Sequence, residues 1–308
     1  DAAADGEQVL VGAIMEHLEQ AGIHSGDSTC FIPTQNISQD MLKRVDEQTR
    51  IIGLKLKIKG CYNIQFAIQG DNLYCLEVNP RSSRTVPFVA KSTGLPMARI
   101  AARITIGIPL SQQEIPRRTT GHVCVKAPVF PFIKLRGLDP APGPEMKSTG
   151  EVFGSDIRAD LAYLKARLAT EIPVATEGGA YLTVREEDKL DLIPIAQSLV
   201  DLNFTIFATP GTADVLRKAN IPVTTSYRIA ERMHPDSLDL MRKGDVNFIV
   251  NVPTISGGAV RDGNMMRRLA VELNIPFVTT MRGAVMEVAA MKARLENVLE
   301  PRHLEVHY

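Results

Sequence analysis

The sequence contains no run of 18 or more apolar residues, so we expect no membrane span. It has no excess of either charge, because lysine plus arginine number 35 and aspartate plus glutamate also number 35. This balance argues against a nucleic-acid partner. The sequence has neither an initiating methionine nor a signal peptide, and we therefore expect it to belong to a longer chain.

The four cysteines are Cys30, Cys61, Cys75 and Cys124, and none of them forms a C-x-x-C pair. This spacing argues against a zinc site and favours buried thiols in a reducing compartment, which we take to be the cytoplasm. Hydrophobic residues make up 44% of the chain and charged residues 23%, as in ordinary globular proteins. A length of 308 residues favours about two domains.

The first 110 residues combine short strands with amphipathic helices, a pattern that predicts an α+β unit with an antiparallel sheet. Ser38 precedes an amphipathic stretch and is typical of a helix N-cap. Gly70 and Asn72 separate two apolar runs, which indicates a hairpin. The predicted elements are a strand at 8–14, a loop at 16–28, a helix after residue 38, strands at 63–69 and 73–78, and helices at 86–93 and 96–106.

Residues 109–150 are rich in proline and glycine, and we expect an irregular connector with short strands there. After a helix at 156–169, short apolar runs alternate with helical patterns, which predicts an α/β domain with a doubly wound parallel sheet. The predicted strands are 180–184, 204–208, 222–226, 246–250 and 276–280, and the predicted helices are 190–202, 212–219, 235–243, 263–274 and 284–298. The predicted domains are 1–110, a connector at 111–170, and 171–308.

The stretch CLEVNPR, at 75–81, places polar side chains on alternate positions of a strand. Glu77 and Asn79 therefore share one face, and Gln65 on the partner strand can join them. Oxygen donors from rigid strands suit a hard cation such as magnesium. We also expect this alternation to hide Leu76 and Val78 behind the ligands. The alternative is an edge strand whose polar face is simply hydrated.

Two arginines follow this strand. Arg81 and Arg84 can both contact phosphate oxygens, and the guanidinium fork suits that role. The second candidate site begins at TPGT, 209–212, a strand-to-helix turn of the kind that binds phosphate. The remaining members of that site come from the ends of predicted strands, where open α/β sheets bind ligands. We expect an anion site made of Lys189, Thr209, Gly211, Thr212, Arg228 and Asn251. The alternative is that threonine only caps the helix.

Four segments, GIHSGDS, NIQFA, LEVNPRSSRTVPFVAKSTG and GPEMKSTGEVFG, resemble the later part of the second ATP-grasp domain of the carbamoyl phosphate synthetase large subunit. The resemblance implies that Gln65, Glu77 and Asn79 bind magnesium or manganese. It also implies that Arg81 and Arg84 lie near the phosphate and the carbamate. The residues implied to contact ATP are Gly22, Ile23, His24, Ser25, Gln65 and Glu77.

Residues 171–308 resemble the methylglyoxal synthase-like regulatory domain of that family. The six residues of the second site then fall on effector-phosphate positions, where nucleotides such as UMP or IMP bind. A working methylglyoxal synthase is disfavoured, because NVPTISGG carries no acidic pair and Asp214 and Asp262 look helical or loop-borne. Glu19 and Asp27 match acids that contact a basic amino acid in some members. Ala127 replaces a third such acid, and Glu19 equally fits a solvated helix-end charge.

The resemblance implies an ATP-dependent ligase that phosphorylates carbamate to carbamoyl phosphate, works with a glutaminase small subunit, and forms an oligomer of such heterodimers. The product would feed arginine and pyrimidine synthesis. No glycine-rich phosphate loop precedes Asp1, so we expect the chain alone to bind ATP weakly and to be inactive. The alternative is a non-catalytic nucleotide-binding regulatory module. Another ATP-grasp ligase is a more distant alternative.

Overall fold

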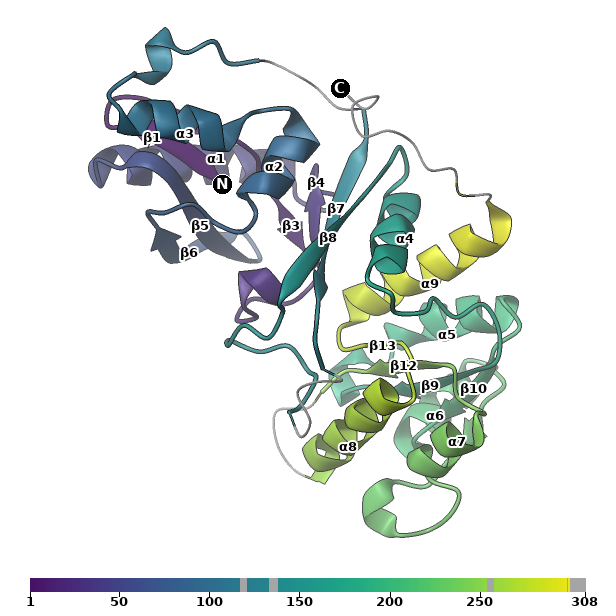
Figure 1. Cartoon of the computed structure of the whole chain (residues 1–308). Helices are drawn as coiled ribbons and strands as arrows, with labels where there is room; N and C mark the ends of the chain where they lie inside the picture. The colour runs from purple at the N-terminus through teal and green to yellow at the C-terminus, as the bar shows by residue number, and fades with distance from the viewer. Residues whose placement is uncertain (117–120, 133–137, 254–257, 298, 300–308) are drawn as a thin grey trace.

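The computed structural model describes residues 1–116, 121–132, 138–253, 258–297 and 299 (Figure 1). Its first sheet is antiparallel and runs in the order β2-β1-β5-β6. Two neighbouring alanines of β1 face opposite ways: Ala3 packs with the helices after the hairpin, whereas Ala2 packs with Tyr62. The elements of this unit are β1 (Ala2–Asp5), β2 (Val9–Val11), α1 (Gln39–Lys55), β5 (Lys59–Gln69), β6 (Asn72–Asn79), α2 (Val86–Thr93) and α3 (Met97–Thr105).

The predicted helix start at Ser38 is confirmed, because the Ser38 hydroxyl accepts a hydrogen bond from the Met41 N–H at 3.3 Å. The predicted hairpin is also found, with Gly70 in the left-handed region at φ +57°. The expectation that Leu76 is hidden was wrong, because its side chain is 49% exposed. The strand lies at the edge of the sheet, and Leu76 has no directly opposite partner at a bulge beside Gln65 and Phe66.

A second antiparallel sheet, β3-β4-β7-β8, takes two strands from near residue 20 and two from the proline-rich segment. The stretch at 16–28 is therefore not all loop, as predicted, since it begins with β3 and ends with a 3-10 turn. Gly154 allows α4 to pack closely, because a Cβ atom there would lie 2.2 Å from the Ala162 carbonyl oxygen. These elements are β3 (Glu16–His17), β4 (Cys30–Ile32), β7 (Val123–Val129), β8 (Gly150–Asp156) and α4 (Ala159–Ala169).

The third sheet is parallel, in the order β11-β10-β9-β12-β13, as the alternation of runs and helices predicts. Ala180 and Leu182 pack against α5, α6 and α9, whereas Tyr181 packs against α7 and α8, so helices cover both faces (Figure 1). The strands are β9 (Gly179–Thr183), β10 (Thr205–Ala208), β11 (Thr224–Thr225), β12 (Phe248–Asn251) and β13 (Phe277–Val278). The helices are α5 (Leu192–Asp201), α6 (Pro210–Lys218), α7 (Ser237–Lys243), α8 (Gly258–Glu272) and α9 (Met281–Glu296).

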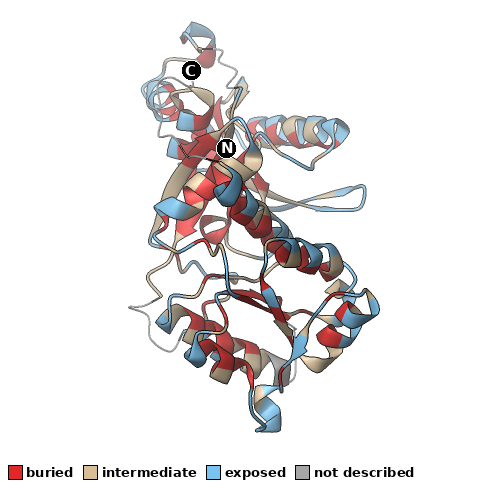
Figure 2. Ribbon diagram, turned by 90° about the vertical axis from the view of Figure 1, so that its right-hand side faces the viewer, coloured by how far each residue is buried: buried red, intermediate tan, exposed pale blue. Residues whose placement is uncertain are grey.

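One continuous apolar core joins the second sheet to the third, through Phe31 and Val125 on one side and Leu182 and Met291 on the other. Buried residues, red in Figure 2, gather where helices face the sheets. In the parts of the chain with assigned structure, no helix combines the length and apolar character needed to cross a membrane. The domain limits at residues 110 and 170 stay a prediction.

A buried polar cluster ties α4 to α9 inside this core. Glu287 is 0% exposed and accepts hydrogen bonds from Tyr163 Oη at 2.8 Å and from Arg167 Nε at 2.9 Å. Burial and the neighbouring Glu287 carboxylate raise the pKa of Tyr163. The guanidinium of Arg167 therefore compensates a carboxylate that water does not reach.

We expect Arg167→Met to lower the free energy of unfolding by about 3–5 kcal/mol, because it leaves the Glu287 carboxylate buried without its counter-charge. The control is Arg158→Met, since Arg158 borders the same helix but pairs with Asp160 at the surface. The control change should leave stability nearly unaltered. Urea unfolding followed by circular dichroism measures both, and equal effects of the two changes would contradict the assignment.

Candidate functional site

A cavity of about 350 Å³ opens at the carboxyl ends of β9, β10 and β12. β10 pairs with one side of β9, and β12 pairs with the other side, so the strand order reverses at β9. Open α/β sheets bind ligands at the carboxyl edge beside such a reversal. The structure brings all six residues of the predicted anion site into its lining: Lys189, Thr209, Gly211, Thr212, Arg228 and Asn251.

The turn from β10 into α6 forms the floor of this cavity. Thr209 is the N-cap residue, yet its side chain makes no capping hydrogen bond to the helix backbone and its hydroxyl lies 3.3 Å from Thr212 Oγ1. Simple threonine capping therefore does not explain this residue. Lys189 overhangs the turn, because a Cβ atom on Gly211 would lie 3.0 Å from Lys189 Nζ. The turn thus combines a helix N-terminus, hydroxyls and an ammonium group.

Charged side chains outside the prediction also line the cavity. Arg185 and Glu186 directly follow β9, and Glu186 pairs with Lys189. The strand-end rule that selected Lys189 would have found both. Asp262, on α8, lines the cavity and accepts a hydrogen bond from the Ala230 N–H at 3.3 Å. Asp214 instead lies on α6 beside Arg217, with 67% of its side chain exposed.

The predicted metal ligands meet across the β5–β6 hairpin. Gln65 lies directly opposite Glu77, and Asn63 lies directly opposite Asn79. Directly opposed residues of an antiparallel pair share a face, so the predicted convergence of Gln65, Glu77 and Asn79 is found. Asn79 Nδ2 donates to Glu77 Oε1 at 3.1 Å, which leaves the Asn79 amide oxygen directed elsewhere.

The loop expected to contact ATP lies beside this hairpin, because Gln65 Nε2 donates to the Ile23 carbonyl at 3.5 Å. The backbone of this loop has a φ of +97° at Gly22, a value that only glycine adopts readily. His24 Nδ1 accepts the Gly26 N–H at 3.0 Å, so its Nε2 is the ring atom left for a ligand. Beneath the loop, Lys126 Nζ donates to the Ser25 carbonyl at 3.2 Å.

The loop that carries both predicted arginines is held by the carboxylate of Asp1. This carboxylate accepts hydrogen bonds from Ser83 Oγ at 2.7 Å and from the Thr85 hydroxyl. Arg84 reaches Ser148, with Nη1 3.4 Å from its carbonyl oxygen, whereas Arg81 is exposed and contacts only the adjacent Ser82 carbonyl among the described groups.

An open cavity of about 470 Å³ lies next to this region, and its lining includes Ser25 and Gln65 from the predicted ATP contacts. Its lining does not include Glu77, Asn79, Arg81 or Arg84, of which all but Asn79 are exposed. The second site is therefore assembled in one cavity, whereas the first is spread along an open face.

Comparison with known proteins decides the family. Residues 2–113 match the model of the carbamoyl-phosphate synthase L chain, ATP binding domain, and residues 191–279 match the MGS-like domain. The carbamoyl phosphate synthase large chain of Methanosarcina barkeri is 43% identical over 95% of this chain and 73% of its own length. The chain belongs to the carbamoyl phosphate synthase large chain family.

Two further relatives show how much of such a protein is present. The large chain of Methanosphaerula palustris is 43% identical over 98% of this chain, which spans 28% of that relative's length. The protein named carbamoyl phosphate synthase large chain, C-terminal section, from Methanocaldococcus jannaschii is 42% identical over 95% of this chain and 49% of its own length. This chain therefore corresponds to about a quarter to a half of these two relatives.

In this synthase-family chain a third cavity, of about 190 Å³, lies between the proline-rich segment and the parallel sheet. Glu19, Asp27 and Ala127 all line it. The interpretation of Glu19 as a solvated helix-end charge was wrong. Glu19 is half-buried, and its carboxylate accepts the Thr29 N–H at 2.7 Å. The residue also follows a short strand and not a helix. Burial raises the pKa of Glu19 to about 7, although the hydrogen bonds from Thr29 oppose the rise.

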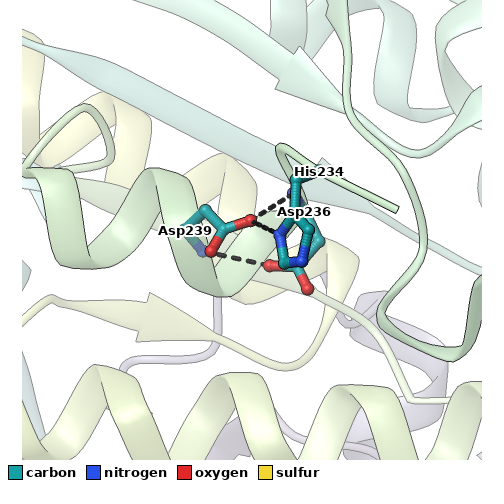
Figure 3. A group of neighbouring side chains, drawn as sticks. All are labelled: His234, Asp236 and Asp239. Carbon is teal, nitrogen blue, oxygen red and sulfur yellow. Dashed lines mark hydrogen bonds and ion pairs between the residues drawn. The ribbon is translucent and has the colours of Figure 1, made fainter. Parts of the chain in front are cut away.

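Figure 3 shows a cluster of His234, Asp236 and Asp239 whose oxygen and nitrogen atoms lie close together. Asp236 Oδ1 accepts the Asp239 N–H at 3.0 Å, and Asp239 Oδ2 in turn accepts the Asp236 N–H at 3.0 Å. These reciprocal bonds form a capping box at the start of α7, and His234 Nδ1 adds a bond to Asp239 at 2.5 Å. Helix capping therefore accounts for this cluster.

The raised pKa of Glu19 predicts a pH effect. The folded state holds its proton up to about pH 7 whereas the unfolded chain releases it near 4.5, so this contribution to stability is lost as the pH rises from 4.5 through 7. Glu19→Gln should abolish that loss. The free energy of unfolding of the variant, relative to wild type, should therefore rise by up to about 3 kcal/mol between pH 5 and pH 8. Denaturation at both pH values measures it, with exposed Glu7→Gln as control. A pH-independent difference would refute the prediction.

Proposed function

We propose that this chain is the carbamate-phosphorylating and nucleotide-regulated part of a glutamine-hydrolysing carbamoyl phosphate synthase. The observation that carries the proposal is the direct cross-strand pairing of Gln65 with Glu77 beside the Gly22–Ser25 loop. The family assignment supports the reaction type: transfer of the ATP γ-phosphoryl group to a carbamate oxygen, with release of ADP. In phosphoryl transfer the protein mainly positions the reactants and stabilises charge.

The donor set of the hairpin fits a divalent magnesium or manganese ion. Gln65, Glu77 and Asn79 offer one carboxylate and two amide oxygens from one rigid sheet face, and a hard cation prefers oxygen ligands with water completing its shell. Such an ion, when bound with ATP, neutralises phosphate charge. Arg81 and Arg84 lie next along the chain and would contact phosphate and carbamate oxygens. His24 Nε2 and the loop around it would orient the nucleotide.

The cavity in the parallel sheet would hold the phosphate of a nucleotide effector of the UMP or IMP type. The Gly211 N–H at the start of α6, the hydroxyls of Thr209 and Thr212, and the ammonium of Lys189 all suit a phosphate dianion. Arg228, which directly precedes a 3-10 turn at Ile229–Glu231, adds a further cation. The cavity lining holds three cations, Lys189, Arg185 and Arg228, against two carboxylates, Glu186 and Asp262. This excess of positive charge and the helix N-terminus favour an anionic ligand over an uncharged one.

A second candidate function is a nucleotide-sensing module without catalysis. It is favoured by the contrast between the two sites, since the effector residues share one cavity while Glu77 and Asn79 lie on an exposed edge strand. The remaining parts of the proposal rest on the family resemblance alone. They are a glutaminase small subunit that supplies ammonia, an oligomer of such heterodimers, a role in arginine and pyrimidine synthesis, and a cytoplasmic location.

Two substitutions separate these functions. Glu77→Ala should weaken Mg-ATP binding at least about tenfold, because it removes the only carboxylate of the donor set. Thr212→Ala should weaken UMP or IMP binding while leaving Mg-ATP binding unchanged. Isothermal titration calorimetry measures both, with exposed Glu47→Ala and Thr205→Ala as matched controls. Nucleotide monophosphate binding without any Mg-ATP affinity would favour the sensing module.

We also expect the 308-residue chain to turn over no ATP above background with bicarbonate or carbamate. Phosphoryl transfer needs contacts to the phosphates from every side, and these residues supply one face. A coupled assay for ADP measures the rate. Robust turnover that depends on carbamate would show that this portion of the synthase is catalytically complete.

A further inference from the structure

Arg267 occupies an unusual position for a charged residue. It lies on α8 and is 1% exposed, among the largest fully buried side chains of the structure. Its Nη1 bonds to the side-chain oxygen of Asn251, which lines the effector cavity. Its Nε and Nη2 bond to the two carboxylate oxygens of Asp139 at 2.9 and 2.6 Å. One guanidinium therefore joins the wall of the effector cavity to the proline-rich segment.

Asp139 begins a segment that is tightly tied together. Its carboxylate also accepts the Ala141 N–H at 2.9 Å, and Lys147 Nζ donates to the Asp139 carbonyl at 3.0 Å and the Ala141 carbonyl at 2.6 Å. Although partial burial acts to raise it, the hydrogen bonds from Arg267 and Ala141 hold the pKa of Asp139 below its usual value. Hydrogen bonds therefore connect the guanidinium of Arg267, through Asp139 and Ala141, to Lys147.

The far end of this segment holds the loop assigned to ATP. Asp27 is 1% exposed, and its carboxylate accepts the Lys147 N–H at 2.8 Å and the Ser148 N–H at 2.9 Å. The His24 N–H donates to the Gly143 carbonyl at 2.9 Å, and the Ser148 carbonyl in turn faces Arg84. The segment thus touches both the nucleotide loop and an arginine expected to contact substrate.

We propose that Arg267 and Asp139 are positioning residues that couple occupancy of the effector cavity to the geometry of the 22–28 loop, an inference that rests on the proposed function of both sites. Arg267 donates to the Asn251 side-chain oxygen, which leaves Asn251 Nδ2 to donate to a phosphate oxygen of a ligand. A bound phosphate and Arg267 would therefore hold opposite ends of one amide, so that binding shifts the group to which Arg267 is bonded. A buried guanidinium needs its hydrogen-bond partners, so any change at Asn251 is redistributed to Asp139. A change in the position of Asp139 then shifts residues 141–148, which are bonded to Asp27 and His24.

A second ion pair provides an internal comparison. Arg282, at the start of α9, pairs with Glu16 and donates to the His17 carbonyl at 3.0 Å, so it also joins the parallel-sheet region to the first 30 residues. It does not line the effector cavity, and Asn251 is not among its partners in the described part of the chain. Removing this bridge loosens the same two regions without touching the proposed route.

The test is hydrogen–deuterium exchange of the whole chain with and without UMP or IMP. In wild type, ligand should slow exchange at the effector turn, 209–212, and change it at 139–148 and 22–28. Asp139→Asn and Arg267→Met should keep the first response and lose the others. Arg282→Met and exposed Arg268→Met should keep all of them.

A second arm needs no ligand. Asp139→Asn alone should speed exchange of the Lys147 and Ser148 amides by about fivefold to tenfold, because the segment that presents these amides to Asp27 loses its ion pair with Arg267. The Asp139 side chain is 29% exposed and asparagine keeps an acceptor oxygen for the buried guanidinium, so this variant should fold even if Arg267→Met does not. Unaltered exchange there in Asp139→Asn would overturn the proposal.

The two proposals fail in different ways. If neither nucleotide slows exchange at 209–212, the effector assignment fails, and the ligand-free arm still decides whether Arg267 and Asp139 position the loop. If a nucleotide protects 209–212 in wild type but leaves 22–28 unchanged, the coupling is refuted while the effector site stands. An equal loss of the distant response in Arg282→Met would also refute the specific route.

Discussion

The carboxylate of Asp27 is the interaction on which the arrangement of this protein depends. It is buried and accepts two backbone N–H groups from residues more than 100 positions later, so the 22–28 loop and the proline-rich segment share one anchor. A carboxylate bonded twice to backbone amides is held in a single orientation. His24 on one side and Ser148 on the other take their positions from it.

The two candidate sites use different physics to gather ligands. The parallel sheet places strand ends at a common edge, and the turn from β10 into α6 brings a helix N-terminus to that edge, so the cavity arises from topology. The hairpin instead relies on register, because a shift of one residue would turn Gln65 away from Glu77. The first arrangement tolerates changes in side chains, whereas the second depends on pairing.

Periodicity made much of this fold predictable. Ser38, Gly70 and the alternating apolar runs are signals that can be recognised in a few consecutive residues. The helix start, the hairpin and the parallel sheet that they predict are found. The six residues that line the cavity of the parallel sheet could be chosen because strand ends are recognisable one at a time. Side-chain pairs between distant segments leave no such pattern: Asp139 and Arg267 are 128 positions apart, and Arg167 and Glu287 are 120 apart. The sequence did not reveal the burial of Glu19 for the same reason, since residues as distant as Ala127 and Gly283 line the same cavity.

The bulge at Leu76 has a consequence for how this hairpin can vary among related sequences. It separates the Gln65–Glu77 pair from the turn at Gly70, because pairing restarts in a new register beyond Phe66 and Cys75. Residues gained or lost at the turn can be absorbed by re-pairing of the outer rungs before they reach the oxygen donors. The outer half of the hairpin is thus free to diverge while its inner half stays constrained.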